Sequence, residues 1–113
     1  MRRAVEFETV RRIGIAFPGV VEGTMYGAPA LKYRGKLLAC IPAHRSAEPD
    51  SLAVRVDIID RAELLAAAPD LYYITEHYVA YNAVLVRLPR VNEGVLRDLL
   101  GMAYKFVCRN PQR

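Results

Sequence analysis

Histidine, cysteine and serine are the residue types in this sequence that could act as general bases or nucleophiles. His77 stands between Glu76 and Tyr78, and a histidine with a carboxylate partner can accept a proton from a substrate. The serines, Ser46 and Ser51, share one polar loop and lack the GxSxG context of a nucleophilic serine. We therefore expect His77 to be a structural or surface residue, and we assign no catalytic residue.

Metal and cofactor motifs are missing as well. Cys40 and Cys108 do not form a CxxC pair, and His44 and His77 are too isolated to predict a metal site. The glycines form neither GxGxxG nor GxxxxGK[ST], the loops that bind phosphate groups. We expect Cys40 to act as a small buried hydrophobe. The sequence thus predicts no metal and no cofactor.

Length, composition and charge limit the remaining function classes. The 113 residues are enough for one domain, which we place over residues 1–113. No apolar run approaches the length of about 18 residues that a membrane span needs, and the N-terminus does not resemble a signal peptide. We therefore expect a cytoplasmic protein with free thiols and no membrane partner. The net charge of +4 permits an anionic partner without requiring one.

Basic side chains alternate with apolar ones in the predicted strands. Because successive side chains of a strand point to opposite faces, we expect these cations to collect on the sheet face away from the helices. Cations with tyrosine neighbours suit phosphate contact and base stacking. DNA is therefore the leading candidate partner, although a solvated sheet face carries the same residue types. The expected nucleic-acid-binding residues are Lys32, Arg34, Lys36, Arg55 and Arg87.

The same alternation places apolar residues on this face too. Leu85 falls on the same side as Arg87, and part of the apolar run from Leu37 to Ile41 must also lie there. A surface that is partly apolar and partly charged is typical of a dimer interface or a peptide groove. A protein-interaction module that works as a homodimer through this face is thus the second candidate function.

An enzyme of unknown chemistry is the third candidate. It would need a cleft that joins the Glu76–Tyr78 cluster to the loop at Gly27, Ala28 and Pro29. The residues that we expect around such a pocket are Tyr26, Pro29, His77, Tyr78 and Tyr81.

Hydrophobic periodicity and turn residues predict the elements that must position these side chains. The order α-β-β-β-α-β-β-α, with hairpin-length connections, predicts an α+β fold in which helices cover one face of a five-stranded antiparallel sheet. We expect a helix over 7–16, a loop over 23–29, a hairpin over 30–41, a strand over 52–57, a helix capped by Asp60, strands over 72–76 and 83–88, and a last helix capped by Asn92.

Several short motifs occur in the order typical of one family. With them the chain resembles the YjbR/MmcQ family of small bacterial proteins, from Val10 to Val107. The resemblance implies a two-layer fold like that of secretion chaperones, and members are often labelled DNA-binding. Many members carry a tryptophan before the last strand, where this chain offers Tyr78 and Tyr81. The motifs are Phe17-Pro18-Gly19-Val20 with Glu22, Tyr26-Gly27-Ala28-Pro29-Ala30, Arg34-Gly35-Lys36-Leu37, Val54-Arg55-Val56-Asp57, His77-Tyr78 and Val84-Leu85-Val86-Arg87-Leu88.

Overall fold

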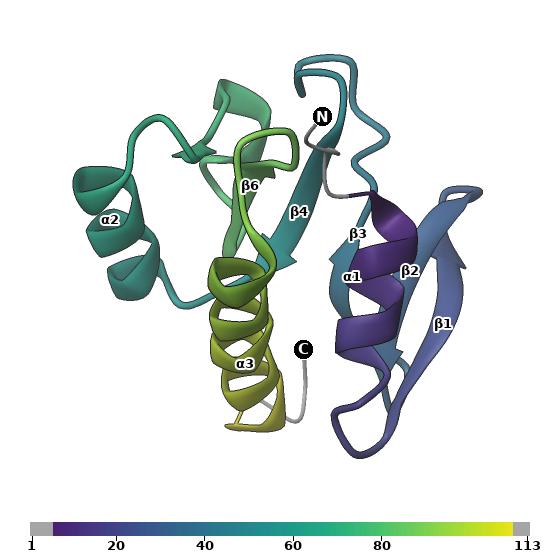
Figure 1. Cartoon of the computed structure of the whole chain (residues 1–113). Coiled ribbons are helices and arrows are strands. Elements are labelled where there is room, and N and C mark those ends of the chain that lie inside the picture. The colour runs from purple at the N-terminus through teal and green to yellow at the C-terminus, as the bar shows by residue number, and fades with distance from the viewer. Residues whose placement is uncertain (1–5, 110–113) are drawn as a thin grey trace, which may run out of the picture.

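A curved antiparallel sheet carries helices on one side (Figure 1). The computed structural model describes residues 6–109. In chain order, the elements of this range are α1 (Phe7–Gly14), β1 (Val20–Met25), β2 (Ala28–Tyr33), β3 (Lys36–Cys40), β4 (Ser51–Arg55), α2 (Ile58–Ala67), β5 (Tyr72–Tyr73), the 3₁₀ helix η1 (Glu76–Tyr78), β6 (Ala83–Arg87) and α3 (Glu93–Arg109).

The sheet has the order β1-β2-β3-β4-β6-β5, and every neighbouring pair is antiparallel. The predicted α+β fold is therefore confirmed, but the predicted number of five strands is wrong. The missing strand is β1, which pairs with β2 along its whole length. Much of the predicted loop over 23–29 belongs to these two strands, and the turn between them is only Tyr26 and Gly27. Both residues have positive φ, +53° and +79°, which suits a two-residue hairpin turn with the twist of its strands.

One face of the sheet, here called the helix face, holds the main core. Val10 and Ile13 of α1 are buried there, as the periodicity of this segment predicts. The apolar stripe of α3 packs over β3 and β4. In Figure 1, α1 and α3 lie side by side across the same face of the sheet. The buried residues of α3 are Leu96, Leu99, Leu100, Ala103, Phe106 and Val107.

Two helix starts test the predicted caps. Asn92 caps α3, since its Oδ1 accepts a hydrogen bond from the Val95 amide at 2.8 Å. The cap predicted for α2 is wrong: Asp57, not Asp60, is the N-cap, and its carboxylate accepts from the Ile59 amide at 2.7 Å. Asp57 has extended backbone angles just before the helix, which is the conformation that a capping residue needs.

The segment between α2 and β6 also differs from prediction. The strand expected over 72–76 contains only Tyr72 and Tyr73, and Glu76–Tyr78 forms a 3₁₀ helix instead. The backbone then continues through residues 79–82 to β6. Residues 74–82, here called the crossing segment, provide one wall of the site described next.

A bulge in the hairpin decides which apolar side chains leave the core. Leu31 pairs with Ala39 and Lys32 with Leu37, so Leu38 is an extra residue in β3. As a result Leu38 and Ala39 both join the core of the helix face. Strict alternation fails at this point. The opposite side of the sheet, the second face, carries Ala30, Cys40, Ala53 and Leu85, together with the partly buried Leu37.

Candidate ligand-binding groove

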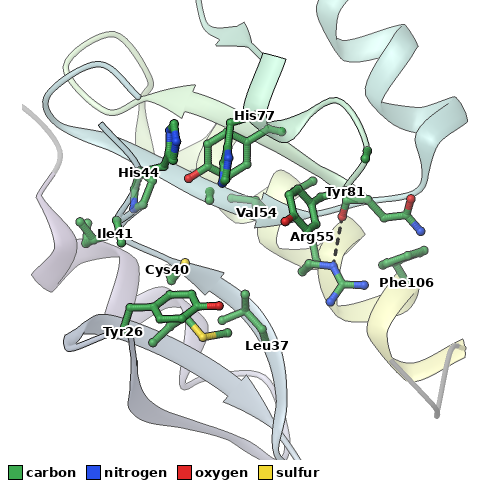
Figure 2. Close-up of a pocket in the computed structure, with 18 residues that line it drawn as sticks. Tyr26, Leu37, Cys40, Ile41, His44, Val54, Arg55, His77, Tyr81 and Phe106 are labelled. Atoms are coloured by element: carbon green, nitrogen blue, oxygen red, sulfur yellow. Dashed lines mark hydrogen bonds between the residues drawn. The ribbon is translucent and has the colours of Figure 1, made fainter. Parts of the chain in front are cut away.

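A groove of about 890 Å³ lies on the second face, between the β1–β2 turn and the crossing segment. Figure 2 shows side chains from both sides pointing toward the space between them. Its lining residues are Met25, Tyr26, Leu37, Cys40, Ile41, Pro42, Ala43, His44, Ala53, Val54, Arg55, His77, Tyr78, Ala80, Tyr81, Asn82, Ala83 and Phe106.

The floor of the groove is apolar because a second, smaller core lies beneath it. Ala30, Cys40, Ala53 and Leu85 are buried, and Tyr73 and Tyr78 pack against them, together with other partly buried residues. Leu85 lies on this face, as alternation predicts, but it is fully buried and does not contribute to an open surface. Burial also raises the pKa of the Cys40 thiol, which keeps the thiol protonated and poorly nucleophilic. The apolar residues of this face are thus mostly covered by the chain itself.

Arg61 holds the crossing segment in place. This α2 side chain is 7% exposed and donates hydrogen bonds to four backbone carbonyls of the segment and the start of β6. The acceptors are Tyr78 O at 3.3 Å, Val79 O at 3.1 Å, Tyr81 O at 2.7 Å and Ala83 O at 3.1 Å. A guanidinium suits this task because its donors are fixed in one plane. Arg61 therefore positions the wall that presents Tyr78 and Tyr81.

Sequence reasoning did not identify Arg61 as important. A lone cation in a short amphipathic helix has the pattern of a solvated residue. The available signal was its neighbourhood: Arg61 falls between the capping residue Asp57 and the apolar Leu64 and Leu65, near the helix stripe that faces the protein. This position predicts that Arg61 is buried, but it does not predict which carbonyls Arg61 binds.

Two histidines stack at one end of the groove. The rings of His44 and His77 have centroids 3.6 Å apart and planes within 8° of parallel. The Ser46 amide donates to His44 Nδ1 at 3.1 Å, and the Ser46 hydroxyl lies 2.8 Å from Thr75 Oγ1. Desolvation, followed by the charges of His77 and Arg45, lowers the pKa of His44, although its side chain remains exposed. The sequence did not predict that these histidines would meet.

Arg55 lies at the other end of the groove. Its Nε donates to the Asn82 carbonyl at 3.1 Å, the bond drawn in Figure 2, and its guanidinium carbon is 5.4 Å from the centre of the Phe106 ring. The two terminal nitrogens have no hydrogen-bond partner within residues 6–109. Burial lowers the pKa of Arg55, which nevertheless stays charged because arginine is so basic. Arg55 therefore offers free donors to a ligand.

Arg87 is on the same face but is fully engaged. Nε and Nη2 bind both oxygens of Glu48 at 2.8 and 2.9 Å, and Nη1 donates to the carbonyls of Pro69 and Asp70. This pairing with Glu48 raises the pKa of Arg87. Arg55 pairs with Ala83 while Arg87 pairs with Ser51, so the two arginines occupy opposite ends of the β4–β6 ladder. Arg87 thus lies on the predicted sheet face, but it does not cluster with Arg55 and its donors are occupied.

The hairpin cations are divided too. Lys32 lies on the second face, where its side chain runs beside Gly23. Arg34 is in the turn after β2, with positive φ, and its guanidinium lies 5.5 Å from the centre of the Tyr33 ring. The Lys36 amine lies 5.8 Å from the same ring. Since Tyr33 belongs to the core of the helix face, Arg34 and Lys36 surround the hairpin tip and do not join Arg55 in the groove.

Four of the five residues expected around a pocket do line the groove. Tyr26, His77, Tyr78 and Tyr81 all line the groove, whereas Pro29 does not. Tyr26 is 87% exposed, so its ring projects from the β1–β2 turn. Within residues 6–109, no three His, Cys, Asp or Glu side chains are arranged to hold a metal ion. In the same range no helix is both long and apolar enough to cross a lipid bilayer.

Comparison with known proteins gives the family. The model of the YjbR family matches residues 15–106, which include every strand and most of α3. The chain belongs to the YjbR family. This YjbR-family domain resembles the crystal structure of Deinococcus radiodurans protein DR2400, described with the family-model domain DUF419. The TM-score is 0.73 at 21% identity, over 92% of this chain and 79% of that chain. At this identity the likeness shows the fold alone. No curated protein matches the sequence significantly.

Proposed function

We propose that this YjbR-family domain binds single-stranded nucleic acid, with bases in the groove and phosphates on Arg55 and Lys32. One observation carries the proposal: a groove rich in aromatic side chains ends at an arginine whose terminal donors are free. The volume of about 890 Å³ lies in the range of pockets that bind small organic groups.

The aromatic side chains supply the surface for bases. Tyr26, Tyr78 and Tyr81 present their rings to the groove, which the largely buried Phe106 also lines, and base–aromatic stacking contributes about 1–3 kcal/mol per base. Stacking of this kind needs bases that are not already stacked in a duplex, which favours a single strand. Tyr26 is the most accessible of the four rings.

The cations supply contacts for phosphates. Lys32 pairs with Leu37 of β3, and β3 pairs with β4 so that Arg55 falls near the same level. Two strand spacings separate them, about 10 Å. Within residues 6–109 neither Lys32 nor Arg55 forms an ion pair, in contrast to Arg87. Phosphate contacts usually come from such unpaired basic side chains.

Fluorescence anisotropy with a labelled oligothymidylate tests this function. We expect binding at about 50 mM salt that weakens as salt rises, with a log–log slope of roughly −0.7 per phosphate contact. Arg55→Gln should weaken binding about tenfold and reduce the slope by one contact. Arg97→Gln is the matched control, because Arg97 is an exposed arginine on α3. No binding at about 50 mM salt, or equal losses in the two variants, would refute the proposal.

Protein contact is the second candidate, and the exposed ring of Tyr26 favours it. A tyrosine that is 87% exposed beside the partly buried Met25 and Leu37 could anchor a second copy of the chain or a peptide. Light scattering after size exclusion would distinguish the homodimer. A dimer that Tyr26→Ser converts to a monomer supports it, and a wild-type monomer at high concentration excludes it.

A further inference from the structure

The stacked histidines at the end of the groove join two separate parts of the chain. His44 follows β3, and His77 belongs to η1 in the crossing segment. Two imidazoles this close cannot both be protonated without strong repulsion between like charges. This repulsion disfavours a doubly protonated pair unless an anion lies beside it.

Hydrogen bonds indicate which ring stays neutral. The Ser46 amide, which can only donate, lies 3.1 Å from Nδ1 of His44, and the Ser46 hydroxyl lies 2.8 Å from the same nitrogen and can also donate. Both contacts are hydrogen bonds when Nδ1 of His44 carries no proton. The low pKa of His44 agrees with a neutral ring. His77 contacts the rings of Tyr78 and Tyr81 but makes no hydrogen bond within residues 6–109. The ring that can take up a proton and then offer two N–H donors is thus His77.

The surrounding charges permit an anion at this end. Arg45 is next to His44 and is the other cation that acts on it. Glu76 precedes His77 and is the adjacent carboxylate of the crossing segment, while Glu48 of the same loop as His44 is bound by Arg87. Tyr26, Tyr78 and Tyr81 are the titratable groups of the surrounding groove walls. Both imidazoles are exposed, so solvent and ligand can reach them.

The histidine pair and Arg55 lie at opposite ends of the groove. Cys40 pairs with Ala53, and the chain beyond Cys40 runs away from Arg55 toward His44. Figure 2 accordingly has the histidines and Arg55 on different sides of the groove, with Val54 between them. A strand of nucleic acid along the groove would meet a permanent cation at one end and a titratable pair at the other.

We propose that His77, stacked on the neutral His44, forms a proton-dependent subsite for a phosphate oxyanion at the end of the groove opposite Arg55. His77 takes up one proton as the anion binds, and no covalent bond is made or broken. The choice of a nucleic-acid phosphate as the anion rests on the proposed function, whereas recognition of an oxyanion by the histidine pair does not.

Oligothymidylate affinity at pH 5.5 and pH 7.5 tests the subsite. Its phosphodiesters and bases do not change charge in this range, while imidazole ordinarily titrates near pH 6.5, about midway. We expect tighter binding at pH 5.5, by at most about tenfold, the limiting factor that one pKa unit of differential interaction gives. His77→Asn should bind with less than about a twofold pH effect. Arg55→Gln should bind more weakly at both pH values and keep the wild-type ratio between them.

A second arm separates this subsite from the proposed function. Inorganic sulfate keeps its charge over the same range, and NMR of the histidine ring protons reports its binding directly. We expect saturable shifts of the His77 signals at pH 5.5 that are absent at pH 7.5. If oligothymidylate fails to bind but sulfate produces these shifts, the nucleic-acid function is wrong and the subsite stands. The subsite is overturned if His77→Asn keeps the full pH effect, or if sulfate leaves the His77 signals unchanged at pH 5.5.

Discussion

The two ends of the second face carry arginines with opposite surroundings. Arg87 binds both oxygens of Glu48 and two backbone carbonyls, and its guanidinium carbon lies 4.4 Å from the centre of the Tyr73 ring. Arg55, at the other end of the same pair of strands, makes one hydrogen bond to a carbonyl. Residue type and strand position are the same, but only Arg55 retains donors for a ligand.

The neighbours of a cation therefore decide its role. A guanidinium with five donors is saturated when carboxylate and carbonyl oxygens surround it, and it then acts as a cross-link. Arg87 connects β6 to the loop before β4 and to Pro69 and Asp70, which follow α2, in this way. A guanidinium with free donors in a groove is available for phosphate. Substitution of each arginine tests this contrast.

Arg61 is the most completely enclosed arginine of the comparison, and its loss should have the largest effect. Arg61→Met leaves several carbonyls of the crossing segment without a donor, so we expect the free energy of unfolding to fall by about 2–4 kcal/mol. Urea denaturation measures it. Glu63→Met, at an exposed position of the same helix, should change the value by less than about 0.5 kcal/mol. Equal effects of the two substitutions would show that the hydrogen bonds of Arg61 do not stabilise the fold.

Arg87→Met should reduce stability by less than Arg61→Met does, and it should leave nucleic-acid binding in the groove unchanged. Glu48 is 48% exposed and recovers water, so the loss comes mainly from the bonds to Pro69 and Asp70 and the contact with Tyr73. We expect a decrease of about 1–2 kcal/mol in the free energy of unfolding. Oligothymidylate affinity should stay within about twofold of wild type. A large loss of affinity with full stability would reverse the roles assigned to the two arginines.

The elements of the fold differ in how well the sequence predicts them. Periodicity predicts α3, β4 and β6 because their apolar residues fill one large core. It misses β1, since Gly23 and Pro29 resemble loop residues and only the pairing of β1 with β2 makes a strand of that segment. The bulge at Leu38 is invisible for the same reason, because it depends on register with a neighbouring strand.

The site is predicted less well than the fold because its residues meet across long sequence distances. Alternation places Arg55 and Arg87 on one face, as the structure does, but it cannot identify Glu48 as the partner of Arg87. The stacking of His44 on His77 likewise depends on how a loop and the crossing segment fold back over the sheet. Strand geometry predicts a direction for each side chain, and tertiary packing then determines what that side chain meets.

Acid should weaken the ion pair between Glu48 and Arg87 and so lower the stability of the fold. The hydrogen bond from Arg87 is the main reason that the pKa of Glu48 is lowered below its ordinary value of 4.5. A carboxyl with a lowered pKa in the folded state stabilises the protein above its unfolded pKa, and this contribution disappears as the pH falls through the folded pKa. Urea denaturation at pH 7 and pH 3 should therefore show a smaller acid-induced loss in Glu48→Gln than in wild type. Glu63→Gln, a control with an exposed carboxyl, should keep the loss of wild type; identical behaviour of the two variants would contradict a stabilising pair.

Arg55→Gln should have the smallest effect on stability and the clearest effect on binding. The side chain makes one hydrogen bond and contacts Phe106, and a glutamine amide can replace the donor to the Asn82 carbonyl. We expect the free energy of unfolding to change by less than about 0.5 kcal/mol, while affinity for oligothymidylate falls about tenfold. Measured beside Arg87→Met, this variant should give the opposite pattern: binding lost and stability kept. If Arg55→Gln instead destabilises the protein as much as Arg87→Met does, Arg55 is a second structural cross-link, because a side chain held for stability has no surplus donors to offer a phosphate.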